Sequence, residues 1–243
     1  LCYNYGVDGM WVDGDNWAVE REYGKAALRE FMETTGLRRL PKKPEQKGFV
    51  AFNQMMRRAF RRYLARYTDA MHAHNPEFRI TSNWAYSATM PEPVNIAVDR
   101  LSGDSVPPNG FNMARFEARY MASQGMLWDL MSWGFTSNVP SGPARNPKPA
   151  IQLQQEAATV AALGGAFQVY YKQKKDCSVY MWNMKIMAEV AEFCRARKKI
   201  CHGAHTVPQI ALLHSTHALY IENTNVLHGW KGTMRHMSGG LEA

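Results

Sequence analysis

Five short apolar runs, separated by longer stretches with helical periodicity, constrain the fold of this chain more than any other feature. This alternation is typical of strand–helix units arranged around a parallel sheet. The expected strands are Val7–Val12, Phe78–Asn83, Asn95–Leu101, Met126–Trp133 and Ala166–Tyr171. No fixed-period repeat accompanies them, which excludes a solenoid. The sequence therefore predicts an α/β fold with a parallel sheet.

The clearest helix is predicted between residues 49 and 74, where apolar positions recur every three or four residues. These positions are Phe52, Met56, Phe60, Tyr63, Tyr67 and Met71. Four arginines fall together on another face of the same helix, namely Arg58, Arg61, Arg62 and Arg66. Further helices are expected over 114–123, 149–163 and 183–199.

Composition and charge exclude several classes of protein. The 243 residues are 46% hydrophobic, which is enough for a packed core and rules out a disordered chain. The net charge is 29 − 21 = +8. Such an excess permits an anionic partner, and the arginine stripe could contact nucleic acid, but no base-reading motif accompanies it and a charged outer helix face is the commoner case. No apolar stretch approaches the roughly 20 residues that span a bilayer. We therefore expect neither a nucleic-acid partner nor a membrane partner.

The helical pattern ends near Cys201 and is followed by an apolar run and by residues rich in histidine and asparagine, so we place a domain boundary near residue 203. Residues 1–203 form the first predicted domain and residues 204–243 the second. The run from Val207 to Leu213 is interpreted as a buried strand that starts a second α/β unit. Six of the eight histidines lie in the last 42 residues, but the spacing from Cys194 and Cys201 to His202 and His205 matches no standard zinc pattern. No metal site or cofactor is predicted, and the four cysteines are expected to be free.

Polar and aromatic residues follow the expected strands, at the end where parallel α/β proteins bind ligands. They are Asp13, Asp15, Asn83, Trp84, Asp104, Trp133 and Gln168, with Asp129 deeper in its strand. Carboxylates, an amide and aromatic rings on one face suit a carbohydrate, because sugar rings stack on aromatic side chains and hydroxyls bind polar ones. Trp11 and Trp128 belong to the same set, although both could equally be core residues.

One segment resembles a known family. The stretch from Tyr5 to Gly14, with Asp8, Trp11 and Asp13 in a Tyr-x-x-Asp…Trp-x-Asp arrangement, resembles the nucleophile strand of family 29 alpha-L-fucosidases. Residues 114–120, 128–133 and 154–168 resemble related barrels, including family 42 beta-galactosidases, and 207–215 resembles the entry to the flavodoxin-like domain that follows those barrels. The resemblance implies a partial (β/α)₈ TIM barrel, strands 4 to 8, whose strands 1 to 3 come from elsewhere, followed by the start of a flavodoxin-like domain.

The resemblance further implies a glycoside hydrolase of the retaining type with Asp13 as nucleophile. We choose Asp104 as acid/base because it ends the strand that would be barrel strand 6; Glu117 is the rival, although a structural ion pair with Arg115 or Arg119 is expected for it. The two carboxyl groups should lie about 5–5.5 Å apart, whereas roughly 6.5–9.5 Å would indicate inversion. The partners expected are a terminal fucoside-like or galactoside-like sugar and a second copy of the chain. The resemblance favours a secreted or periplasmic location.

Two other readings stay open at the level of sequence. The triplet Asp13-Gly14-Asp15 after an apolar strand also resembles the DxD motif of metal-dependent, nucleotide-sugar glycosyltransferases. A barrel that binds glycans without turnover would use the same tryptophan and aspartate residues.

Overall fold

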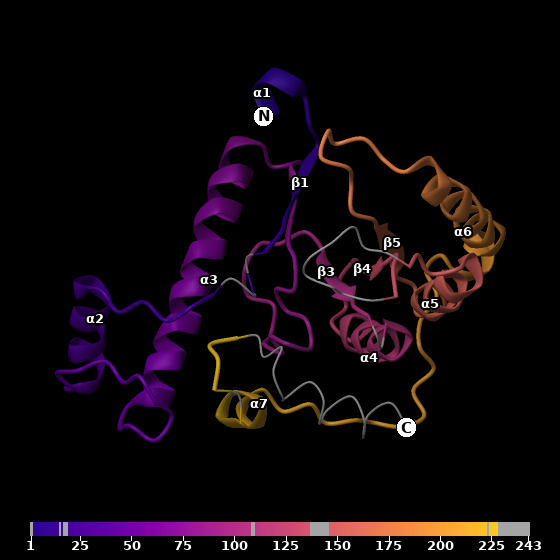
Figure 1. Ribbon diagram of the computed structural model, residues 1–243. Coiled ribbons are helices and arrows are strands. Elements are labelled where there is room, and N and C mark those ends of the chain that lie inside the picture. The colour runs from indigo at the N-terminus through magenta and orange to yellow at the C-terminus, as the bar shows by residue number, and fades with distance from the viewer. Residues whose placement is uncertain are drawn as a thin grey trace. The chain divides into compact units, whose positions relative to one another are not determined.

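The computed structural model describes residues 2–14, 16, 19–107, 110–136, 146–222 and 224–227. Helices and parallel strands alternate along the chain, so the fold is mixed α/β as predicted (Figure 1). The chain divides into two compact units. Described residues up to Asp99, together with 213–227, form the first unit, and those from Arg100 to Leu212 form the second. None of the described helices is long and apolar enough to cross a membrane.

The first unit contains two paired strands and four helices among its described residues. Its elements are α1 (Cys2–Tyr5), β1 (Gly9–Val12), α2 (Lys25–Thr35), α3 (Phe49–His74), β2 (Arg79–Ser82) and α7 (Thr216–Glu222). Strands β1 and β2 are parallel, with a register that runs from Gly9 opposite Arg79 to Val12 opposite Ser82. Their carboxyl ends therefore lie at the same edge.

Helix α3 has the predicted bounds, and its apolar stripe explains its packing. Phe52 and Phe60 are buried, and the Phe52 ring meets Phe31 of α2 edge-on with a centroid separation of 5.6 Å. The helix begins after Gly48, whose φ of 89° is in the left-handed region that favours glycine. Tyr63, predicted to belong to the buried stripe, is 51% exposed because the packed face turns toward Leu64 and Thr68 instead.

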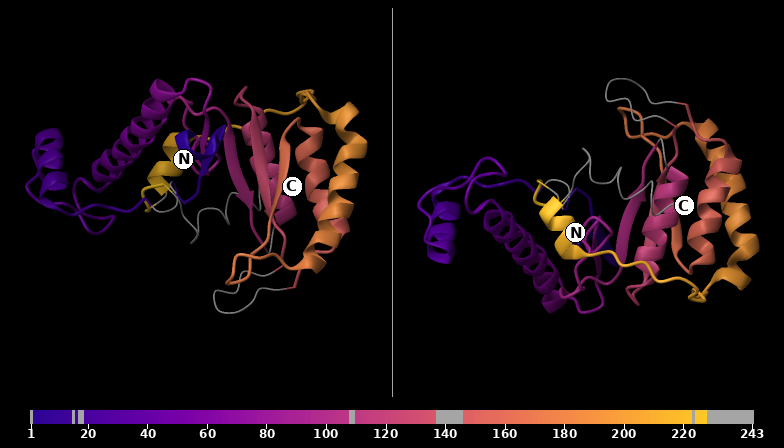
Figure 2. Two further views of the ribbon diagram at one scale, coloured as in Figure 1. Left: turned by 90° about the horizontal axis from the view of Figure 1, so that it is seen from above. Right: turned by 90° about the horizontal axis from the view of Figure 1, so that it is seen from below.

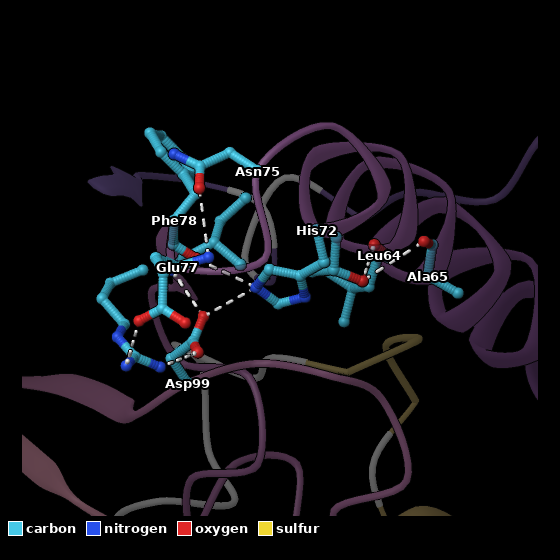
Figure 3. Close-up of polar contacts among 10 residues, drawn as sticks. Leu64, Ala65, His72, Asn75, Glu77, Phe78 and Asp99 are labelled. Atoms are coloured by element: carbon cyan, nitrogen blue, oxygen red, sulfur yellow. Dashed lines mark hydrogen bonds and ion pairs between the residues drawn. The ribbon is translucent and has the colours of Figure 1, made fainter. Parts of the chain in front are cut away.

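Polar contacts tie the last turn of α3 to the start of β2 (Figure 3). The His72 ring points toward two acceptors: its Nε2 lies 3.0 Å from the Phe78 carbonyl oxygen and 3.1 Å from Asp99 Oδ2. Asp99 also accepts hydrogen bonds from the Ile80 N–H and from Arg79. Burial raises the pKa of Asp99, but these hydrogen bonds outweigh it and hold the pKa below its ordinary value.

Helix α7 packs on α3 through a buried arginine. The Arg57 guanidinium lies 3.6 Å from the centroid of the Tyr220 ring, and its Nε donates to the Val226 carbonyl oxygen at 2.5 Å. Tyr220 in turn donates to Glu92, which also pairs with Arg61 at 2.7 Å. Burial lowers the pKa of Arg57 to about 10, so this arginine is still a cation at neutral pH.

The second unit is a three-stranded parallel sheet with helices packed on it. Its elements are β3 (Leu101–Ser105), α4 (Gly110–Ala122), β4 (Trp128–Trp133), α5 (Ala150–Ala162), β5 (Ala166–Tyr170) and α6 (Met181–Cys201). The strand order is β3-β4-β5. Both views of Figure 2 place α5 and α6 on the same side of this sheet. Among the described strands, the two sheets do not close into a barrel.

Two strand predictions are wrong. The strand expected over Asn95–Leu101 instead runs from Leu101 to Ser105, because the polar side chains of Ser102 and Asp104 find partners on β4. Residues 207–213 form no strand. Ile210 and Leu213 are 92% and 91% exposed, and no described strand pairs with this segment. Residues 223 and 228–243 of the predicted second domain lie outside the described residues.

Candidate functional site

Asp13 and Asn83 lie at the shared carboxyl edge of β1 and β2. Each follows its strand directly, and the parallel register brings them together. Asn83 Nδ2 donates to Asp13 Oδ1 at 3.1 Å, and the Asn83 N–H donates to the Val12 carbonyl oxygen at 2.9 Å. Asn83 is 1% exposed, whereas Asp13 is exposed. A buried amide thus orients a carboxylate that solvent or a ligand can reach.

The loop after β2 is held in an unusual backbone conformation. Trp84 and Tyr86 have φ values of 67° and 58°, a region that non-glycine residues rarely adopt. Ser87 stabilises the loop, because both its N–H and its hydroxyl donate to the Trp84 carbonyl oxygen. Asn16 Nδ2 donates to the same oxygen at 3.2 Å. Such strain is found at functional sites, and here it lies directly beside the Asp13–Asn83 pair.

A cavity of about 640 Å³ opens beside Asp13 within the first unit. Its walls come from the β1 edge, from the segment that leads into α2, from α2 and from α3. Four acidic residues, Asp13, Glu20, Glu22 and Glu30, are among those that line it, together with apolar residues that include Phe60 and Tyr63. A volume of this size is in the range of small-molecule sites. Its lining therefore combines acidic residues, Asp13 among them, with aromatic ones.

The tryptophans predicted for the sugar site near Asp13 do not line this cavity. Trp84 is 3% exposed and packed in the core, and Trp11 is half-buried on β1. Asp15 lies outside the described residues. The aromatic surface comes instead from Phe60 and Tyr63 of α3. The sequence predicted both in the buried stripe of the helix; this is correct for Phe60, which is 5% exposed, and wrong for Tyr63, which is 51% exposed.

Four of the predicted site residues share one face of the second sheet. Successive side chains of a strand point to opposite faces of the sheet. In the register, Met131 of β4 pairs with Asp104 of β3 and with Gln168 of β5, so these three side chains point to the same face. Asp104, Asp129, Trp133 and Gln168 therefore all point to this face. Ser105 and Ser132 point to the other face, because both donate hydrogen bonds to Glu156 of α5.

Asp104 and Trp133 are joined at the carboxyl end of this face. Trp133 Nε1 donates to Asp104 Oδ2 at 2.9 Å, and the Trp133 ring is fixed by edge contact with Tyr170, 5.7 Å away between centroids. Asp104 is the fourth residue of the five-residue strand β3 and is 5% exposed. The hydrogen bond orients this buried carboxyl toward the half-exposed side of the sheet.

Asp129 lies near the amino end of the same face, as the second residue of β4. Ser102 Oγ donates to its Oδ1 at 2.6 Å, and Arg100 Nε lies 3.1 Å from its Oδ2. Burial raises the pKa of Asp129, and the bonds from Ser102 and Arg100 oppose this shift. The partners of Asp129 come from the start of β3, away from the Asp104–Trp133 pair.

Two further candidates lie away from the face that carries Asp104. A Cβ atom on Gly165 would lie 2.3 Å from the Trp128 ring, so Trp128 packs under the turn that leads into β5 and acts as a core residue. Glu117 is fully buried on α4, and the expected partners point elsewhere: Arg119 donates to the Arg115 carbonyl oxygen, and the Arg115 guanidinium lies 6.0 Å from the Phe111 ring centroid.

Within the described part of the chain, no group of three or more histidine, cysteine or carboxylate side chains is arranged to hold a metal ion. Asp13 and its partner Asn83 lie in the first unit, and Asp104 and its partner Trp133 lie in the second.

No model of a known protein family and no curated protein matches this chain.

Proposed function

We propose that this chain is a glycoside hydrolase of the retaining type, in which Asp13 is the nucleophile. The observation that carries the proposal is the setting of Asp13. This carboxylate follows a parallel strand, is oriented by the Asn83 amide 3.1 Å away, and lines a cavity of about 640 Å³. The resemblance of the segment around Asp13 to a nucleophile strand supports the same role.

In the proposed reaction, an Asp13 oxygen attacks the anomeric carbon as the bond to the leaving-group oxygen breaks, and water then hydrolyses the glycosyl ester. The Asn83 amide holds Asp13 Oδ1 and leaves Oδ2 to attack. Asp104 is the proposed acid/base: it protonates the leaving oxygen in the first step and deprotonates water in the second. Trp133 sets the direction of its carboxyl group.

The corresponding fold proposal is that the described strands are strands 4 to 8 of a (β/α)₈ barrel. The parallel pairing of β1 with β2, and of β3, β4 and β5 in sequence order, supports it. So does the distribution of side chains in the second unit, since the helices cover one face of the sheet and the candidate site residues lie on the other, as they do inside a barrel.

Hydrolysis of aryl fucosides and galactosides by the full chain tests the function. Asp13→Asn should abolish turnover and leave sugar binding intact, because the amide keeps the shape of the carboxylate but is not a nucleophile. Asp69→Asn, which changes an exposed carboxylate on α3 away from the cavity, is the control and should keep wild-type turnover. Equal turnover by the Asp13 variant and the wild type would remove Asp13 from the mechanism.

Added EDTA separates hydrolysis from metal-dependent transfer. Turnover that survives EDTA supports the proposal. Activity that requires both Mn²⁺ and a nucleotide sugar would instead establish a glycosyltransferase. Glycan binding without turnover across the whole panel would establish a binding protein.

A further inference from the structure

A buried ion pair lies beneath the carboxyl ends of β3 and β4. Lys148 Nζ lies 2.7 Å from Glu156 Oε1, and the two residues are 1% and 0% exposed. Lys148 Nζ also donates to Ser132 Oγ at 3.1 Å. Ser132 and Ser105 both donate to Glu156 Oε2. This cluster was not predicted from the sequence, although Glu156 lies in line with Leu153, Ala157 and Val160 on the apolar side of its helix.

The hydrogen bonds exclude a nucleophilic role for Ser132. A serine activated by lysine gives its proton to a neutral amine. Here the Ser132 hydroxyl donates to Glu156, and the lysine donates to the serine oxygen. Burial lowers the pKa of Lys148, but the Glu156 carboxylate opposes the shift. The 2.7 Å contact pairs the lysine with the glutamate, and the serines complete the hydrogen bonding of the glutamate side chain.

The cluster joins several elements at one point. Ser105 and Ser132 are opposite each other in the register of β3 and β4. Glu156 belongs to α5, and Lys148 is fixed by its own N–H, which donates to the Gly134 carbonyl oxygen at 2.9 Å. Gly110, the first residue of α4, approaches so closely that a Cβ there would lie 2.8 Å from Lys148 Nζ. Buried charges with full hydrogen bonding specify one arrangement of their neighbours.

Each serine is the chain neighbour of a candidate site residue. Ser105 follows Asp104, and Ser132 precedes Trp133. Since adjacent side chains point to opposite faces of a strand, a contact that fixes the serines on the helix side also fixes Asp104 and Trp133 on the other side. These two residues are the ones joined by the 2.9 Å hydrogen bond.

We infer that the Lys148–Glu156 pair is a positioning device, which acts through Ser105 and Ser132 to hold the Asp104 carboxyl group against the Trp133 indole. The catalytic consequence rests on the proposed function, because it requires Asp104 to be the acid/base. The structural coupling between the pair and Trp133 does not depend on that function and has its own readout.

The test replaces the charged pair by apolar residues of similar size, Lys148→Met with Glu156→Leu, in the full chain. Such replacements of buried ion pairs often leave stability unchanged or raise it, so the urea midpoint should stay at or above that of the wild type. The indole N–H resonance of Trp133, assigned by its loss in Trp133→Phe, should nevertheless move toward the position of a free indole. In the active protein, kcat should fall roughly 100-fold, while KM stays within about twofold of the wild type.

Ser132→Ala is a milder second variant that removes one hydroxyl, and it should move the same resonance. Its matched control is Ser102→Ala, which removes a buried hydroxyl that joins the amino ends of the same two strands. The control should leave the Trp133 resonance in place. A stable double variant with Trp133 at its wild-type position overturns the inference.

The failure of the proposed function gives a different result, because a wild-type protein without glycosidase activity still shows whether the Trp133 resonance responds to the pair. A moved resonance supports the positioning role with or without turnover, and an unmoved one refutes it.

Discussion

Arg57→Met tests how the segment around α7 is held against α3. The arginine is 2% exposed, its guanidinium lies over the Tyr220 ring at 3.6 Å, and its Nε donates to the Val226 carbonyl oxygen. Methionine keeps much of the side-chain volume but removes the charge and the donors. It leaves the Tyr220 ring without its cation and the Val226 oxygen without its donor.

The expected loss of stability follows from these contacts. A hydrogen bond from a charged group contributes about 1.5–3 kcal/mol, and a desolvated cation–π contact about 2 kcal/mol. The variant also avoids the desolvation cost of a buried charge, which offsets part of this loss of stability. Burial opposes the charged form of Arg57 and lowers its pKa to about 10. We expect a net decrease of about 3 kcal/mol in the free energy of unfolding.

Urea unfolding of the full chain, followed by circular dichroism, measures this decrease. Arg58→Met is the matched control, because Arg58 is the next residue of the same helix and is exposed. The control should unfold at the wild-type midpoint. If Arg57→Met lowers the free energy by less than about 1 kcal/mol, a value typical of a single neutral hydrogen bond, or by no more than the control, the buried contact does not hold this segment.

Two more predictions concern the acid stability of the first unit and the packing of the second. Asp99→Asn should destabilise the protein at pH 7. The folded-state pKa of Asp99 lies below its unfolded value of about 3.9, so its contribution is present above pH 4 and is lost as the pH falls through the folded pKa. Urea midpoints from pH 7 to 2 should therefore fall less steeply for the variant than for the wild type, and parallel curves would contradict this. Gly165→Ala should lower the free energy of unfolding by about 1–3 kcal/mol, because its methyl group meets the Trp128 ring. Adding Trp128→Leu should restore part of the loss, and an additive double variant would show that the two positions do not touch.

Periodicity predicted the regular elements well where packing follows the apolar pattern. Helix α3 has the predicted bounds, and Ala166–Tyr170 differs from the expected strand by one residue. Strand β3 was misplaced, because Ser102 and Asp104 are polar by composition yet satisfied by partners on β4. Residues 207–213 have the hydrophobicity of a strand, but pairing requires a neighbouring strand, which the sequence does not reveal.

The sequence indicated which polar residues lie at the strand ends, but not which helices pack beside them. Strand ends indicated Asp13 and Asn83, and the parallel register does bring them into contact. The cavity beside them could not be predicted, because it depends on how α2 and α3 pack and on which face of α3 is buried. That packing leaves Tyr63 exposed at the cavity. The Lys148–Glu156 pair was equally hidden, since a buried lysine becomes recognisable only when its partner is placed next to it.

Trapping of a covalent intermediate tests the central claim most directly. The full chain is incubated with 2-deoxy-2-fluoro fucosyl and galactosyl fluorides, in which the fluorine at C2 slows hydrolysis of the glycosyl ester and the fluoride leaving group permits its formation. Mass spectrometry of the intact chain and of its peptides then locates the sugar. The account predicts one sugar per chain, attached to Asp13, and no adduct on Asp13→Asn. An adduct on any other residue, or no adduct with either sugar, would contradict it.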